Sequence, residues 1–520
     1  MVTSDIVRES TVSGWTPMPT VLKTGKAESP LAYLQEMREF GGSTLTRGLK
    51  DEVILDFLER DEELALAIDR AYAHFHELKT SHPRFLALDE SEQIARAHDG
   101  LTNFYSEDAV NPYVAISGAG PWVITLKGAV VYDCGGYGML GLGHSPEPVQ
   151  EAMNQPHVMA NIMTANVSQV EFIEALREEI GHTRGGTPYP SFLCLNSGSE
   201  AMSVASRISD ANTRQLTDPG ARHEGREIRG LTLKGSFHGR TDRPARFSHS
   251  TFKKYKKHLA SFRDNEYLLT VEPNDIANLE AMFARADDEG IFIEAFFMEP
   301  VMGEGNPGYA IEPAFYKRAR ELTLEHGTML VVDSIQAGLR AHGVLSVVDY
   351  PGFEGLQEPD MESYSKALNA GQFPLSVLAL SERAASTYRH GLYGNTMTTN
   401  PRALDIAVAV LDSFTPELRE NIRVRGKELV DGLAALAEET DGGVTGAQGT
   451  GLLLSCELAP KYKVFGENST EEYLRKQGLG VIHGGEQSLR FTPVFDIGAK
   501  EAQLIIDLTR DALLNGPVHA

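Results

Sequence analysis

Strand-like and helix-like patterns alternate along the chain from about residue 110. The runs SFLCL, LTLKG, IFIEAFFMEP, TMLVVD and PLSVLALS are typical of strands, and stretches such as EAMSVASRI and AFYKRARELTLEHG have helical spacing. Ala201, Val204, Ala205 and Ile208 recur at i, i+3, i+4 and i+7, so we expect this helix to lay one apolar face on a sheet. The alternation predicts an α/β fold with a mostly parallel sheet and helices on both of its faces.

The two ends of the chain show different patterns. Residues from about 48 to 100 are rich in Glu, Asp, Leu and Ala, with apolar residues at helical spacing, which predicts an acidic helical extension. After about residue 400, two long helical patterns precede the strand-like runs GLLLSCEL and SLRFTP. This second change predicts a separate, smaller α+β lobe.

Composition excludes several classes of function. With 72 acidic and 48 basic side chains, the 520-residue chain carries a formal charge of −24, which repels nucleic acid and anionic membrane surfaces alike. The N-terminus has no apolar core of signal-peptide length, and no later stretch approaches the roughly 18 apolar residues of a membrane span. Cys134, Cys194 and Cys456 lie far apart and form no metal or redox spacing. We therefore expect a cytoplasmic protein with no metal site and reduced cysteines in its core.

Ligands in open α/β sheets bind beyond the carboxyl ends of the strands, and polar residues stand at several predicted strand ends. The segment 196–200, NSGSE, follows the run FLCL and precedes a helix, so its glycine turn brings free N–H groups to a helix N-terminus. Such a turn can hold a phosphate, or it can be an ordinary capped helix start. Glu299, Glu304 and Asp333 stand at or just after the ends of two further runs. Each of these carboxylates singly could be a structural cap or an ion-pair partner.

Asp333 and Lys366 together indicate a particular chemistry. Asp333 ends a hydrophobic run, where a carboxylate is costly unless a cation compensates it. Lys366 follows another short strand-like run, although a lone lysine is usually a solvated surface charge. A phosphate site, a strand-end Asp and a strand-end Lys in this order suit pyridoxal phosphate. This cofactor needs a lysine for its Schiff base, an acid on its pyridine nitrogen and an anion site.

The sequence also resembles the class III (ω-amino acid) aminotransferases of the pyridoxal-phosphate fold type I superfamily. The resemblance extends over about residues 112 to 510 and rests on the ordered motifs LGLGH, NSGSEA, GSFHGRT, MEPVMGEG, VVDSIQAG, SKALNAG, YGNTMTTNP and LRFTP. It implies a pyridoxal 5'-phosphate-dependent aminotransferase that moves an amino group, from an ω-amine or an amino acid, to 2-oxoglutarate or a similar 2-oxo acid. It also implies a homodimer with the active site at the subunit interface. The alternatives are an aminomutase, racemase or phospho-lyase on the same scaffold, and a non-catalytic binding protein.

The resemblance implies a role for each residue of the cofactor site. Lys366 corresponds to the Schiff-base lysine, Asp333 to the partner of the pyridine nitrogen, and Gln336 to the donor to the ring hydroxyl oxygen. The cation that Asp333 faces would then be the protonated pyridinium. The other expected cofactor contacts are phosphate binding by Gly198 and Ser199, ring stacking by Phe237, and Thr396 reaching the phosphate of the neighbouring subunit.

Three further residues fall where the family handles substrate carboxylates: Arg240, Glu304 and Arg490. A planar guanidinium suits bidentate pairing with a carboxylate. The resemblance therefore leads us to expect that Glu304 pairs with Arg490 for the amino donor and releases it for 2-oxoglutarate. Arg240 would hold the donor's distal carboxylate.

Two departures from the family pattern affect these expectations. The chain has Ser334 where the family usually carries an acid, and Thr398 and Thr399 where it usually carries paired glycines, which puts bulk near the expected interface. The expected division of the chain is an acidic helical extension (1–105), the N-terminal part of a small domain (106–165), a large cofactor domain (166–405) and the C-terminal part of the small domain (406–520).

Overall fold

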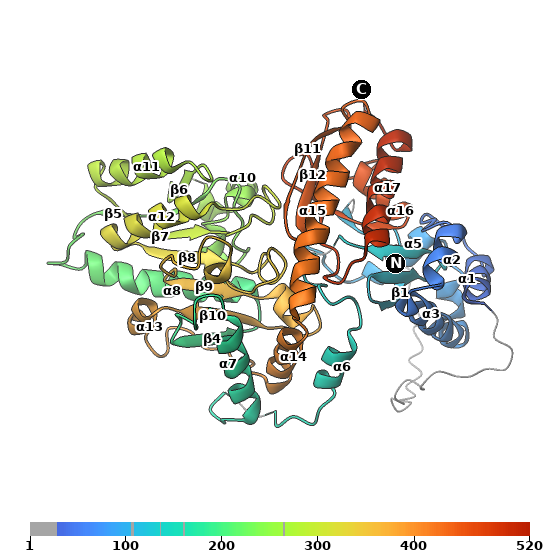
Figure 1. Cartoon of the computed structure of the whole chain (residues 1–520), viewed down its shortest axis with the longest axis horizontal. Coiled ribbons are helices and arrows are strands. Elements are labelled where there is room, and N and C mark those ends of the chain that lie inside the picture. Colours follow the sequence, from blue (N-terminus) through green and yellow to red (C-terminus); the bar gives the residue numbers. More distant parts are fainter. Residues whose placement is uncertain (1–28, 106–108, 136, 160–161, 264–265, 520) are drawn as a thin grey trace, which may run out of the picture.

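The computed structural model describes residues 29–105, 109–135, 137–159, 162–263 and 266–519. Its largest sheet has seven strands (Figure 1), in the order β4 (Ser191–Leu195), β10 (Ser376–Leu380), β9 (Met361–Tyr364), β8 (Met329–Asp333), β7 (Ile291–Met298), β5 (Glu227–Leu233) and β6 (Leu268–Val271). Six strands run parallel, and β10 runs antiparallel to both of its neighbours. The predicted α/β fold with a mostly parallel sheet is confirmed.

Helices cover both faces of this sheet, as the alternation predicts. On β8, Met329 and Val331 pack in the core cluster that contains the α8 (Gly198–Thr217) face of Ala201 and Val204. The alternate β8 residues face the cluster that contains α11 (Ile276–Asp288) and α12 (Pro313–His326). Successive strand side chains point to opposite faces, so a strand covered on both sides is apolar without interruption.

The described residues also form two four-stranded sheets. One has the order β1 (Ala115–Ala119), β2 (Trp122–Thr125), β3 (Val130–Asp133), β13 (Leu479–Gly480), and the other has the order β11 (Val444–Thr450), β12 (Leu453–Leu458), β15 (Ser488–Phe491), β14 (Ile482–Gly484). Strands β12 and β15 correspond to the predicted runs GLLLSCEL and SLRFTP. Because β13 pairs in parallel with β3, distant parts of the chain share one sheet.

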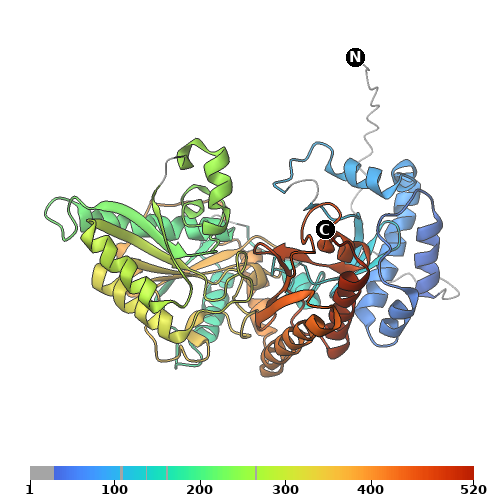
Figure 2. The same cartoon turned by 90° about the horizontal axis from the view of Figure 1, so that it is seen from above.

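The C-terminal helices lie between the large sheet and the N-terminal helices in both views (Figures 1 and 2). They are α14 (Pro401–Asp412), α15 (Pro416–Glu439), α16 (Thr470–Lys476) and α17 (Ala499–Asn515). The other helices after β3 among the described residues are α6 (Glu147–Met153), α7 (Val167–Glu179), α9 (Asp242–Ala245), α10 (His249–His258), α13 (Glu382–Thr387) and the 3₁₀ turns Ala260–Phe262, Val347–Asp349 and Lys366–Asn369.

Residues 29–105 of the predicted N-terminal extension are mainly helical, and its residues 1–28 lie outside the described residues. The extension contains α1 (Pro30–Glu39), α2 (Asp51–Leu58), α3 (Glu62–Ser81), α4 (Pro83–Leu86) and α5 (Glu90–His98). Asp61 caps α3 by accepting from two backbone N–H groups, and its other oxygen accepts from Trp122 Nε1 on β2 at 2.6 Å. One carboxylate thus both starts the helix and ties it to the β1–β3 sheet.

Two expectations from composition can be compared with the described residues. Cys134 and Cys456 are buried and Cys194 is half-buried, and all three are free thiols. Across the described ranges, no helix combines the length and the apolarity that crossing a membrane requires.

Candidate active site

The predicted site residues gather at the carboxyl edge of the large sheet. Phe237 and Arg240 follow β5, Glu304 follows β7, Asp333 ends β8, Gln336 follows it, and Lys366 follows β9. Gly198 and Ser199 begin α8, directly after β4. Arg490 comes from β15 of a different sheet. The carboxyl ends of parallel strands meet at one edge, which is why residues far apart in sequence converge here.

Asp333 is a buried carboxylate held by three donors. Its Oδ2 accepts from His238 Nδ1 at 2.9 Å, and its Oδ1 accepts from the Ile335 N–H at 3.2 Å and from Ser363 Oγ at 3.4 Å. Oδ2 takes one of these bonds and retains capacity for another donor. The geometry suits a carboxylate that is kept rigid while it meets a further cationic N–H.

Lys366 lies beside Gln336 in a strained backbone conformation. Its φ is +49°, in the left-handed region that non-glycine residues rarely adopt, and its Nζ is 3.3 Å from Gln336 Oε1. Burial and the nearby Arg490 cation lower the pKa of Lys366 to about 8, although Asp333 and Glu304 oppose this shift. A lysine with this pKa is partly neutral near pH 7 to 8, as a nucleophile and proton carrier requires.

Gln336 has an amide nitrogen without a partner. Within the described part of the chain, its buried Nε2 meets no hydrogen-bond acceptor. Gly303 packs so closely that a Cβ there would lie 2.2 Å from Gln336 Oε1. A buried donor without an acceptor is costly, so Nε2 suits a ligand oxygen such as the ring hydroxyl oxygen of pyridoxal phosphate.

The start of α8 has the features of an anion site. Ser197 caps the helix by accepting from the Glu200 N–H, and the Gly198 and Ser199 N–H groups have no protein acceptor among the described residues. A Cβ on Gly198 would lie 2.6 Å from Ile335 Cδ1. Glycine therefore allows the turn to approach the loop after β8, and the two free N–H groups suit a phosphate.

Glu299 holds the backbone of two segments that line the site. Its carboxylate accepts from the Phe237 N–H at 2.9 Å and from the Gly303 N–H at 2.8 Å. Burial raises the pKa of Glu299 to about 7, and the neighbouring Asp333 carboxylate adds to this shift. Glu299 thereby positions the backbone of Phe237, whose ring we expect to stack on the cofactor.

The substrate residues are close together, and Glu304 is within ion-pair distance of Arg240. Glu304 lies 3.9 Å from Arg240, and the Arg240 guanidinium lies over the Phe237 and Phe104 rings at 5.2 and 5.9 Å. Arg490 is buried, donates to the Gly303 carbonyl and lies over the Tyr137 ring at 5.5 Å. Within the described residues, Glu304 makes its ion pair with Arg240 rather than Arg490.

Thr396 follows a loop that is bonded to the start of α8. It is exposed, in a loop whose preceding residues Tyr393 and Asn395 bond to Glu200. No contact among the described residues joins Thr396 to Lys366, Asp333 or Gln336.

The two threonines that replace the family's glycines differ in conformation. Thr399 has φ +53°, the region that glycine adopts freely, whereas Thr398 is buried and donates to the Asn395 carbonyl at 3.0 Å. A β-branched residue at positive φ is strained by roughly 1–2 kcal/mol. The loop thus keeps a glycine-type backbone at Thr399 without the glycine.

We expect Thr399→Gly to raise the melting temperature. Relief of strain exceeds the roughly 0.5–1 kcal/mol of extra chain entropy that glycine loses on folding, so the net gain is about 0.5–1 kcal/mol. Thr398→Gly is the matched control, and it should lower the melting temperature because a buried, bonded side chain is lost. Calorimetry of both variants measures the order, and a lower melting temperature for Thr399→Gly would contradict the strain argument.

Ser334, the other departure, is compensated by a neighbour. Its Oγ donates to the buried Glu362 of β9 at 2.6 Å, and Glu362 also accepts from Tyr189 OH at 2.8 Å and from Ser346 Oγ. Burial raises the pKa of Glu362, and these donors oppose that shift. A carboxylate therefore stands beside position 334, contributed by the adjacent strand.

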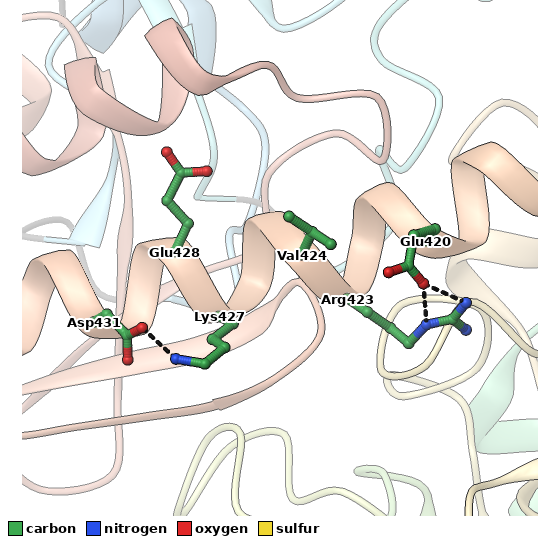
Figure 3. A pocket seen from close by; sticks show the side chains of 6 residues that line it. All are labelled: Glu420, Arg423, Val424, Lys427, Glu428 and Asp431. Carbon is green, nitrogen blue, oxygen red and sulfur yellow. Dashed lines mark hydrogen bonds and ion pairs between the residues drawn. The ribbon is translucent and has the colours of Figure 1, made fainter.

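A shallow depression on α15 carries no comparable chemistry. It is lined by Glu420, Arg423, Val424, Lys427, Glu428 and Asp431 (Figure 3). Arg423 pairs with Glu420 and Lys427 pairs with Asp431, within three or four residues along the helix. These charges satisfy one another at the surface, so the depression is an ordinary solvated helix face.

Several residues of the site were not singled out from the sequence. They are His238, Phe104, Tyr105 and Tyr137. His238 follows Phe237 directly in the motif GSFHGRT, so its place beside the motif was the available signal. Tyr105 stacks on Tyr137 at 6.0 Å between ring centroids, and this contact joins segments that no spacing rule connects.

Comparison with known proteins identifies relatives over most of the chain. A sequence model of the family Aminotransferase class-III matches residues 104–513. An acetylornithine aminotransferase from Thermosynechococcus vestitus is 29% identical over 79% of this chain and 97% of that protein, and an ornithine aminotransferase from Staphylococcus saprophyticus is 28% identical over 81% and 99%. The crystal structure of an ornithine aminotransferase from Toxoplasma gondii has a TM-score of 0.69 and 24% identity, and the match covers 84% of this chain and 98% of that one.

Proposed function

The chain belongs to the class III aminotransferases, which depend on pyridoxal 5'-phosphate, and we propose that it transfers an ω-amino group to 2-oxoglutarate or a similar 2-oxo acid. One observation carries the assignment of the site. Lys366 and the unpartnered Gln336 Nε2 lie at one strand edge, where Asp333 also ends its strand. The acetylornithine and ornithine aminotransferases among the relatives support an ω-amine as the donor.

The donor set fits the cofactor. We assign the phosphate to the Gly198 and Ser199 N–H groups, the ring hydroxyl oxygen to Gln336 and the ring nitrogen to Asp333. When bound, pyridoxal phosphate supplies an aldehyde that takes up the amino group and a ring that withdraws electrons from the substrate carbon. Phe237, whose backbone N–H is held by Glu299, is positioned to cover one face of the ring.

Lys366 acts on protons in this proposal. Its Nζ, with a pKa near 8, takes the proton from the amine-bearing carbon of the substrate and holds it for return. Gln336 Oε1 orients this amine at 3.3 Å. Asp333 stays in place because His238 and Ile335 hold its two oxygens.

Absorption spectra of the two half-reactions test the proposal. The protein loaded with pyridoxal phosphate is mixed with single amines, including ornithine and N-acetylornithine, without any 2-oxo acid. We expect an ω-amine to convert the cofactor completely to its amine form, and 2-oxoglutarate to convert it back. Turnover of a substrate isomer without accumulation of the amine form would instead favour an aminomutase or racemase.

Arg490→Ala should separate the two half-reactions. Arg490 is buried and its guanidinium suits the α-carboxylate of 2-oxoglutarate, so its loss should slow that half-reaction by about 100-fold, or roughly 3 kcal/mol. The donor half-reaction should change far less, because Arg240 and Glu304 remain paired at the other side. Stopped-flow rates for each half-reaction measure the difference.

Arg490→Lys is the control that keeps the charge without the bidentate geometry. Its 2-oxoglutarate half-reaction should be slowed by an intermediate factor. Equal damage to both half-reactions would contradict the assignment of Arg490. Pyruvate serving as acceptor where 2-oxoglutarate does not would move the proposal to a pyruvate-linked transaminase.

We further propose a homodimer with Thr396 at the partner's cofactor phosphate. Large apolar side chains that are more than half exposed cluster in the segment before and within α7, namely Val158, Met159, Ile162, Met163, Val167 and Val170. Such a patch is typical of a protein–protein interface. The division into extension, small domain and large domain stays a prediction, supported by the β3–β13 pairing, and a cytoplasmic location stays a prediction as well.

A further inference from the structure

One carboxylate connects the cofactor-phosphate turn to the loop that carries Thr396. Glu200, in the first turn of α8, accepts from the Asn196 N–H at 2.7 Å through Oε2. Its other oxygen accepts from Tyr393 OH at 2.7 Å and from Asn395 Nδ2 at 2.8 Å. The residues joined in this way are nearly 200 positions apart in sequence.

The helix start does not need this arrangement for itself. Ser197 already caps α8, and its side chain accepts from the Glu200 N–H. Elsewhere in the chain, Glu472 is a first-turn carboxylate whose hydrogen bond and ion pair are both local. It stands in the first turn of α16 and accepts from the Asn468 N–H four residues earlier, as Glu200 does from Asn196, but its remaining partner is Lys476 of the same helix. Glu200 differs from Glu472 in its long-range bonds to Tyr393 and Asn395.

These bonds are strong because the carboxylate is charged. Although partial burial alone would raise it, the pKa of Glu200 is lowered by the hydrogen bonds from Tyr393, Asn196 and Asn395. Hydrogen bonds to an ionised acceptor are roughly twice as strong as neutral ones. Arg207, farther along α8, adds a second tether by donating to the Leu392 carbonyl. The loop 392–395 is thus fixed to the helix that begins at the phosphate turn.

We infer that Glu200 is a positioning residue that links binding of the cofactor phosphate in one subunit to the loop that completes the partner's phosphate site. The inference rests on the proposed dimer and on the role proposed for Thr396. Ordering the turn at Asn196 to Ser199 around a phosphate orders the Glu200 carboxylate, and this fixes the loop that ends at Thr396. Cofactor binding should then tighten the dimer, and by reciprocity the dimer should tighten cofactor binding by the same factor.

The test measures dimerisation rather than activity. The dimer dissociation constant is determined by analytical ultracentrifugation of the cofactor-free protein, with and without saturating pyridoxal 5'-phosphate. For the parent chain we expect the cofactor to tighten the dimer by tenfold or more. In Glu200→Gln we expect less than threefold tightening, because an amide cannot accept on both sides, so either the Asn196 N–H or the pair Tyr393 and Asn395 loses its acceptor.

Two further variants make the outcome decisive. Glu472→Gln removes the same type of first-turn carboxylate without a long-range tether, and it should leave the tightening at the parent value. Tyr393→Phe removes a single hydrogen bond and should give an intermediate value, and it carries the test if Glu200→Gln does not fold. Parent-like tightening in the folded Glu200→Gln or in Tyr393→Phe overturns the inference, as does a parent dimer that the cofactor does not tighten. A parent chain that is monomeric at all concentrations overturns the proposed dimer itself.

Discussion

Lys366→Ala should abolish turnover while the protein still binds pyridoxal phosphate. The variant loses the amine that bonds the cofactor aldehyde and moves the substrate proton, and proton transfer by a positioned group alone is worth about 10²–10⁴-fold. We expect a loss of at least about 10⁴-fold. Gly198, Ser199, Gln336 and Asp333 remain, so the cofactor should still bind, non-covalently. Turnover assays and equilibrium dialysis of the cofactor measure the two effects separately.

Lys366→Arg and Lys234→Ala are the controls for this prediction. Arginine keeps a cation next to Gln336 but cannot release its proton at neutral pH, so it should be as inactive as alanine. Lys234 is exposed and pairs with Glu272 at the surface, and its loss should leave turnover unchanged. Borohydride reduction of the parent, followed by peptide mapping, should place the cofactor on Lys366. Recovery of the cofactor on a different lysine would refute the assignment.

The strand ends were predictable because they depend on local pattern. The run ending at Asp333 is apolar throughout and is buried on both faces, so its last residue had to face the ligand edge. The antiparallel direction of β10 could have been predicted from the length of the connection that precedes it. β9 ends at Tyr364 and β10 begins at Ser376, and this connection is too short for the crossover that a parallel neighbour needs.

The pairings within the site were less predictable, because they depend on side-chain positions that no spacing determines. Glu304 is expected to pair with Arg490 when the amino donor is bound, and no pattern in the sequence indicated that Arg240 also lies within ion-pair distance of it. Arg490 reaches the site from β15, in a different sheet, and the Gly303 carbonyl fixes its position. The relative placement of two sheets is a tertiary property, so only the resemblance could place Arg490 here. Glu362 likewise compensates for Ser334 across two strands whose register had to be known first.

Asp333→Asn should leave the fold intact, weaken cofactor binding and lower turnover by about 10²–10³-fold, the range for removing one preorganised electrostatic partner. The local network can accommodate the amide. With Asn at this position, the neutral His238 ring can accept at Nδ1 from the new NH₂ group and donate from Nε2 to Thr232 Oγ1, 3.1 Å away, which in turn donates to the Phe297 carbonyl at 3.0 Å. No buried polar group is then left without a partner, so stability should change little.

The reaction, unlike the fold, cannot accommodate the amide. The neutral amide cannot stabilise a protonated ring nitrogen, so the electron withdrawal that the cofactor contributes is weakened although every contact around it survives. Asp333→Glu restores the charge at an altered distance and should recover part of the turnover, which gives the order Asp, Glu, Asn. Melting temperature, cofactor dissociation constant and turnover of the three proteins measure fold, binding and chemistry separately. Near-normal turnover in a well-folded Asp333→Asn would show that this carboxylate does not hold the ring nitrogen.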